Sequence, residues 1–114
     1  MNEIQARDFA AEWIAAWNSR DLNRVLNHYR SDIVLLSPVA QKIVGNGRVV
    51  GIEALRKYWE KALAEIPNLH FEFEDLRVGH ECLTILYRNH RGQNAAETFE
   101  LSNGKVVRSF ACYG

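Results

Sequence analysis

The amino-acid sequence predicts an α+β domain in which helices pack on one face of a curved antiparallel sheet. In the first half of the chain, apolar side chains recur three and four positions apart, the spacing of helices that are buried on one side. From about residue 70 the period changes to two, and turn residues separate the segments, which is typical of an antiparallel meander. Helices followed by a run of strands is the order found in α+β proteins.

Size and charge limit the possible organisation and partners. The chain has 114 residues, room for one core, so we predict a single domain over residues 1–114. Fourteen basic residues balance fourteen acidic ones, whereas nucleic acids and anionic membranes need a clustered positive excess, so neither partner is expected. The N-terminus has no leader pattern and no apolar run has the length of a membrane span, so we expect a cytoplasmic protein.

Cysteines and histidines give no sign of a disulfide scaffold or a metal site. Cys82 and Cys112 are only two and lack CxxC spacing, so we expect reduced thiols in the sheet. The four histidines are scattered, without an HxH or HxxxH pair. No cofactor motif is present, and no cofactor or metal is predicted.

Two helices are predicted at the start of the chain. Phe9, Trp13 and Trp17 recur every four residues and form one apolar stripe on the first helix. Asp21 is a good N-cap for a second helix, whose apolar face would continue to Tyr29.

The middle of the chain predicts two short strands and a third helix. Residues 33–36 form an apolar run that Ser37 and Pro38 end, and residues 48–50 are a short strand between glycines. Apolar positions from 52 to 66 share a helical face, and a proline follows.

The last part of the chain predicts four strands joined by turns. Residues 70–74 alternate cleanly between apolar and polar side chains. The later strands are predicted at residues 82–91, 94–101 and 105–113, with turns at Gly92-Gln93 and Ser102-Asn103-Gly104.

Several short motifs occur in a fixed order along nearly the whole chain. They are Trp17-Asn18-Ser19-Arg20-Asp21-Leu22, Ser31-Asp32, Gly51-Ile52-Glu53-Ala54-Leu55, Glu97-Thr98-Phe99-Glu100-Leu101 and Gly104-Lys105-Val106-Val107. In this order and spacing the chain resembles the NTF2-like superfamily, particularly its SnoaL-like and ketosteroid-isomerase-like branch. The resemblance implies a cone of three N-terminal helices and a curved sheet around an apolar pocket. Its members include isomerases, cyclases, dehydratases, epoxide hydrolases and proteins that only bind or assemble, so it implies no single activity.

The resemblance places three residues at the positions of a ketosteroid-isomerase-like site. Trp13 stands where a tyrosine would hold the oxyanion, and an indole N–H donates a hydrogen bond but is no phenol acid. Ser37 stands where a carboxylate would move the proton, and an unassisted hydroxyl is a poor base. Glu97 matches the late-strand acid, so it is the candidate acid/base, and steroid isomerisation by the usual residues is not expected.

The hairpin around Gly92-Gln93 gives Glu97 a predicted partner. A two-residue turn would place Arg88 directly opposite Glu97, and opposed residues point to the same face of a sheet. Arg88 would then set the protonation of Glu97 as an ion pair, or the two would form a purely structural pair. A slip of one residue would bring Tyr87 or Asn89 to that place instead.

The resemblance also implies the pocket walls and a dimer face. Trp17 is expected to be plain core, whereas the expected wall residues besides Trp13 and Ser37 are Trp59, Phe99, Ser109, Ala111 and Tyr113. His90 is a further candidate for proton transfer near the pocket rim. Arg108, Phe110 and Cys112 alternate with the inward residues, and the family commonly dimerises through that outer face, so a homodimer is expected.

Three functions from different classes follow from these residues. The first is cofactor-free proton transfer of the isomerase, cyclase or dehydratase type on a small apolar, carbonyl-bearing molecule. The second is a protein that binds such a molecule without chemistry. The third is a structural homodimer with a vestigial pocket.

Overall fold

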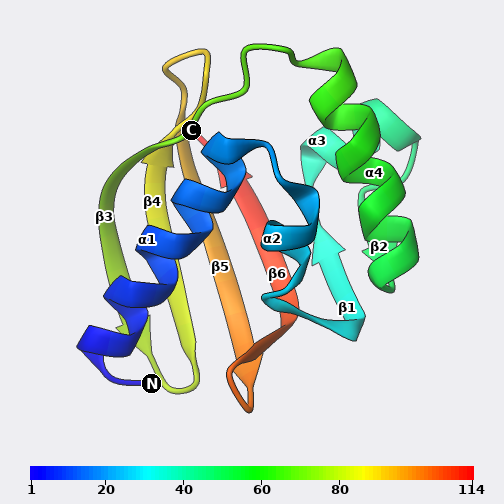
Figure 1. The fold of residues 1–114 in the computed structure, drawn as a ribbon. Coiled ribbons are helices and arrows are strands. Elements are labelled where there is room, and N and C mark those ends of the chain that lie inside the picture. The colour runs from blue at the N-terminus through cyan, green and yellow to red at the C-terminus, as the bar shows by residue number, and fades with distance from the viewer.

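The computed structural model describes residues 1–114 as helices on one side of a single six-stranded sheet (Figure 1). In chain order the elements are α1 (Glu3–Ser19), α2 (Leu22–Leu26), β1 (Tyr29–Leu36), α3 (Pro38–Val44), β2 (Arg48–Val50), α4 (Ile52–Glu65), β3 (Glu72–Gly79), β4 (Cys82–Arg88), β5 (Asn94–Ser102) and β6 (Lys105–Tyr113). The α+β class and the curved sheet of the cone fold are as predicted. None of the helices combines the length and the apolar character that a membrane span requires.

The sheet is mixed, whereas the sequence predicted an antiparallel one. Its strand order is β2-β1-β6-β5-β4-β3, and every neighbouring pair is antiparallel except β1 and β6, which run parallel. Apolar alternation indicates which face of a strand is buried, but it carries no information about which distant strand lies beside it.

The two N-terminal helices begin and end on clear capping groups. Asn2 and Gln5 form a capping box at the start of α1, and Arg20 closes that helix in the left-handed region with φ 62°. The Asp21 side chain accepts from the Arg24 N–H at the start of α2, as predicted. The predicted continuation of this helix to Tyr29 is wrong, because Tyr29 already pairs with Val106 as the first residue of β1.

The structure has four helices rather than the predicted three. α3 follows β1 directly, and the Ser37 hydroxyl caps it by accepting from the N–H groups of Val39 and Ala40. Pro38 occupies the first turn, where its missing N–H is harmless, and Gly45 closes the helix with φ 77°. Serine, proline and glycine at these places are helix signals. We interpreted the serine and proline only as the end of a strand, and the glycine only as a boundary of the next one.

The predicted pairing of Arg88 with Glu97 is wrong. Arg88 lies opposite Asn94, and the residue opposite Glu97 is Ile85. The strands are joined by the five residues 89–93 rather than by a two-residue turn, because the Asn89 side chain accepts from the backbone N–H groups of Arg91 and Gln93 and closes a longer loop. The shift is three residues, an odd number, so Arg88 points to the opposite face from Glu97.

Helices cover one face of the sheet and leave the other face open. The helices lie over one face, and a continuous core fills the space between (Figure 1). No element of the chain covers the other face, toward which Arg108, Phe110 and Cys112 point, as predicted. Arg108 and Cys112 are exposed there, and Phe110 is half-buried. Both cysteines are free thiols. Val107 does not share the inward orientation of Ser109 and Ala111, because a bulge at this point turns Val106 into the core instead.

Candidate functional site

A cavity of about 90 Å³ lies between the helices and the inner face of the sheet. Its walls come from α1, α3, α4, β4, β5, β6 and the loops between them. Twelve of the sixteen lining residues are hydrophobic. The lining residues are Trp13, Trp17, Ser37, Val39, Tyr58, Trp59, Ala62, Ile66, Leu69, Phe71, Tyr87, Asn89, His90, Glu97, Ala111 and Tyr113.

Glu97 is the acid of this cavity. It sits on β5 between Ile85 and Ala111, and only 5 % of its surface is exposed. The Ser109 hydroxyl donates to Glu97 Oε2 at 2.6 Å, and Oε1 accepts no hydrogen bond. Burial raises the pKa of Glu97 to about 7, because the low-dielectric site disfavours the charged form and Ser109 offsets this only in part.

All four tyrosines of the chain surround Glu97, each from a different element. Tyr29 comes from β1, Tyr58 from α4, Tyr87 from β4 and Tyr113 from β6. Burial is the main reason that the pKa of each phenol is raised, to about 12 for Tyr58, and the nearby carboxylate of Glu97 raises it further. The phenols are therefore neutral at ordinary pH and available as hydrogen-bond donors.

The predicted role of Trp13 as a ligand donor does not fit its hydrogen bond. The Trp13 Nε1–H donates to the Tyr29 hydroxyl at 2.9 Å, so this donor is already used. The Trp13 ring stacks on Phe71 with centroids 5.5 Å apart and meets Tyr87 edge to face at 5.4 Å. Trp13 is a cavity wall, as expected, but its N–H serves the protein interior.

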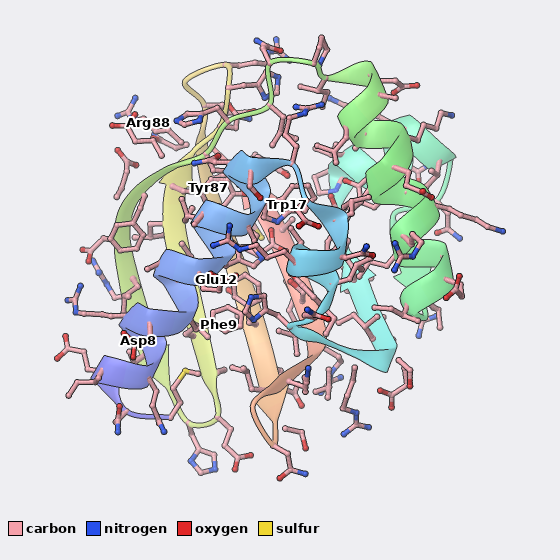
Figure 2. All side chains as sticks on the ribbon, viewed as in Figure 1. Asp8, Phe9, Glu12, Trp17, Tyr87 and Arg88 are labelled. Carbon is pink, nitrogen blue, oxygen red and sulfur yellow. The ribbon has the colours of Figure 1, made fainter.

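Trp17 contributes to the cavity, although we expected it to be plain core. It lies one helical turn beyond Trp13, near the end of α1, and it meets Trp59 edge to face with ring centroids 4.9 Å apart (Figure 2). Its Nε1–H is buried and has no hydrogen-bond partner in the chain. A buried donor without an acceptor is costly, so this N–H is a candidate contact for a ligand oxygen.

The other predicted wall residues divide into two groups. Ser37, Trp59, Ala111 and Tyr113 line the cavity, whereas Phe99 and Ser109 lie behind its wall, fully buried. The Ser109 hydroxyl still reaches the site, because it donates to Glu97. The Ser37 hydroxyl is engaged as the cap of α3.

Arg88 is not part of the site. It lies at the periphery of the molecule (Figure 2), where its Nε donates to Glu74 Oε2 at 2.8 Å. This ion pair is exposed to solvent on both sides. Glu97 therefore has no cationic partner.

The rim carries a histidine that the sequence also indicated. His90 lies in the loop after β4 and lines the cavity, and its Nδ1 is buried without a partner. Burial and the nearby Arg91 lower the pKa of His90, so the neutral imidazole is favoured.

The lining residues that sequence reasoning did not assign to the site are mainly Trp17, Tyr58 and Phe71, and Tyr87 was named only as the alternative to Arg88 under a slipped register. Tyr58 and Tyr87 each adjoin a residue that we had already singled out, Trp59 and Arg88, and a correct register for β4 would have placed Tyr87 inside. No group of three or more His, Cys, Asp or Glu side chains is placed to hold a metal ion.

Comparison with known proteins agrees with this architecture. The SnoaL-like domain family matches residues 10–109, and the chain therefore belongs to the SnoaL-like family. A comparison with functionally curated proteins finds no match.

Solved structures show the same fold. A SnoaL-like protein of unknown function from Burkholderia thailandensis is 37 % identical, with a TM-score of 0.95 over 99 % of this chain and 97 % of that one. An NTF2-like protein of unknown function from Cytophaga hutchinsonii is 14 % identical, with a TM-score of 0.74 over 95 % and 88 % of the two chains. TerC, co-crystallised with polyporic acid, is 12 % identical, with a TM-score of 0.79 over 96 % and 92 %.

Proposed function

We propose that the chain binds a small apolar, carbonyl-bearing molecule in the cavity and that Glu97 transfers a proton on it without a cofactor. One observation carries the proposal: a fully buried carboxyl with a pKa of about 7 and no cationic partner stands in a cavity with aromatic walls. A catalytic acid/base is most effective when its pKa lies near the operating pH. Perturbed carboxyls in clefts are typical of functional sites.

The proposed chemistry uses the polar groups that the protein interior leaves free. The ionised Glu97 takes a proton from the carbon next to the carbonyl, and the protonated Glu97 returns it at another position of the same molecule. The carbonyl oxygen would accept from the unpartnered Trp17 N–H or from a phenol, which supports the negative charge that develops there. Isomerisation, cyclisation and dehydration share this first step.

Hydrogen–deuterium exchange tests the proton transfer without knowledge of the natural substrate. Cyclohexanone in heavy water is a small apolar ketone whose α-protons exchange slowly, and NMR follows the loss of their signals. We expect the protein to accelerate the exchange and Glu97→Gln to abolish the acceleration, because the amide keeps the size of the carboxyl but cannot carry the proton. Acceleration that survives in Glu97→Gln contradicts the assignment of Glu97.

Binding is tested separately by tryptophan fluorescence. Titration with cyclohexanone, the ketone of the exchange assay, should quench the emission of the cavity indoles in a saturable way. If the Glu97→Gln variant binds the ketone but does not accelerate proton exchange, whereas the wild type does both, the protein is an enzyme. Binding by both forms with no exchange by either supports the second function, a protein that binds without chemistry.

The uncovered face of the sheet supports a homodimer as a further part of the proposal. Val34, Leu36, Val50 and Phe110, here called the outer patch, lie on neighbouring strands β1, β2 and β6 and alternate with buried residues. Leu36 and Val50 are exposed to 38 % and 52 %. Apolar side chains gathered on one face are typical of an interface. Light scattering on the wild type and on Phe110→Glu tests it, since a charge in the interface should give a monomer.

A further inference from the structure

The cavity contains an acid but no cation. Its polar lining groups are hydroxyls, the Trp17 indole N–H, the Asn89 amide, the His90 imidazole and the Glu97 carboxyl, and no lysine or arginine lines it. Ser109 donates the one hydrogen bond that Glu97 receives, at Oε2. A buried carboxylate without a counter-ion is costly, and in folded proteins such a group is normally paired with a cation.

Aromatic rings line the same cavity as this carboxyl. Trp13, Trp17 and Trp59 line the cavity together with Phe71 and Tyr87. The face of an aromatic ring attracts a cation, and indole does so most strongly. Rings and a carboxylate around one small space are the two components that recognise an organic cation in water.

From this combination we infer that the cavity binds small quaternary ammonium ions, with Glu97 as the counter-ion and the indoles as the cation–π wall. This binding goes beyond the proposed proton transfer and does not depend on it. The cavity of about 90 Å³ favours a compact head group. A ligand of this class would supply the positive charge that the protein itself does not place beside Glu97.

The lining favours a quaternary over a primary ammonium. A primary ammonium has three N–H donors, all of which need acceptors. Glu97 Oε1 is the one carboxylate oxygen that accepts no hydrogen bond, and most of the remaining wall is hydrophobic. A trimethylammonium group has no donor to satisfy, so it loses less on leaving water.

The inference implies a particular dependence on pH. The groups that face Glu97 are Tyr29 from β1, Tyr58 from α4, Tyr87 and His90 from β4 and its loop, and Ser109 and Tyr113 from β6, whereas α1 brings only neutral indoles. The phenols stay neutral below about pH 10 because their pKa values are raised. Glu97 alone therefore changes from neutral to negative as the pH rises through about 7.

The test compares two probes of the same shape. Choline carries a trimethylammonium group, and 3,3-dimethyl-1-butanol replaces its nitrogen by carbon and is neutral. Calorimetric titration should show that choline binds at least about tenfold more tightly at pH 8. The affinity for choline should fall about tenfold from pH 8 to pH 6, because the ionised fraction of a group with a pKa of about 7 falls from about nine-tenths to one-tenth.

Three variants test whether the preference for choline and its pH dependence come from Glu97. Glu97→Gln should remove both the preference for choline and its dependence on pH. Glu100→Gln is the matched control: it lies on the same strand but pairs with Arg108 on the outer face, so it should leave choline binding unchanged. His90→Gln should keep the pH dependence, which excludes repulsion by a protonated imidazole as its cause.

Two outcomes overturn the inference: choline binding no tighter than the neutral alcohol in the wild type, or a preference for choline that persists in Glu97→Gln. The wild-type comparison stands even if Glu97→Gln does not fold. Failure here is distinguishable from failure of the proposed function, because ketone exchange is measured without choline. Exchange without choline preference refutes only this inference, and choline preference without exchange refutes only the proton transfer.

Discussion

The Asn18 side chain makes two hydrogen bonds to the backbone of Phe71, in the way that a residue of an adjacent β-strand would. Its Nδ2 donates to the Phe71 carbonyl at 2.9 Å, and its Oδ1 accepts from the Phe71 N–H at 2.8 Å. These two bonds attach the end of α1 to the segment that leads from α4 to β3. Phe71 lines the cavity, whereas Asn18 does not. Asn18 therefore holds one wall residue of the site in place from outside the cavity.

Asn18→Ala should destabilise the fold by about 2 kcal/mol, because it removes two hydrogen bonds and leaves a half-buried N–H and C=O without partners. Urea denaturation followed by fluorescence measures the loss. Asn23→Ala is the control, since Asn23 accepts a single hydrogen bond from Arg56 at the surface, and it should cost less. Equal losses in the two variants would contradict the role given to Asn18.

Glu97 should make the protein less stable as the pH rises. Its pKa is about 7 when folded and near the ordinary 4.5 when unfolded, so the folded state holds its proton more tightly. The stability from this group is full below about pH 4.5, declines between 4.5 and 7 and is lost above 7, by about 3 kcal/mol in all. Unfolding free energies of the wild type and Glu97→Gln across this range measure it, and the difference should grow in favour of the glutamine variant. A constant difference would show that Glu97 has an ordinary pKa.

Ala111→Phe should fill the cavity and abolish ligand binding. Ala111 lines the cavity from β6 and is 9 % exposed, so a phenyl group there occupies ligand space and costs about 1–3 kcal/mol of stability through overpacking. The readouts are ketone titration and light scattering. Cys112→Ser, the exposed next residue, is the control and should bind normally. A dimer should persist in Ala111→Phe, because Ala111 faces the cavity and not the outer patch.

Trp13→Phe should lower the stability of the fold by more than the smaller size of the side chain explains. It removes the donor to the buried Tyr29 hydroxyl, so a double-mutant cycle with Tyr29→Phe should give a coupling of about 1 kcal/mol. Thermal denaturation of the four proteins measures it. Additive losses would show that the bond contributes nothing to stability.

Arg88→Ala should leave ligand binding and proton transfer unchanged. Its ion pair with Glu74 is exposed, and such pairs contribute little to stability because water and salt screen them. Ketone exchange and urea denaturation check both statements. A large loss of proton exchange in Arg88→Ala would contradict the strand register, which puts Arg88 outside the site.

The sequence predicted the elements with strong periodicity and missed those set by single side chains. The stripe of Phe9, Trp13 and Trp17 was sufficient for α1, and alternation was sufficient for the faces of β5. The additional helix α3 depends on the cap provided by Ser37, and the neighbour of β1 depends on contacts between distant segments. Neither leaves a periodic signal.

The candidate site follows the same division. Glu97 and three of the seven aromatic wall residues, Trp13, Trp59 and Tyr113, were found from motif and parity. The partner of Glu97 was not, because the loop that Asn89 closes shifts the strand by three residues. The free donor was assigned to Trp13 rather than Trp17, since spacing along a helix cannot tell which indole finds an internal acceptor such as Tyr29.

Because all four tyrosines lie in one region of the molecule, their absorbance can be used to follow the state of the cavity. Every phenol of the chain lies beside the same carboxyl, and each has a raised pKa. Tyrosinate absorbance in an alkaline titration therefore reports from one place only, with no background from surface phenols. Its appearance will mark the entry of hydroxide into the cavity or the loss of the fold, and a bound ligand should delay it.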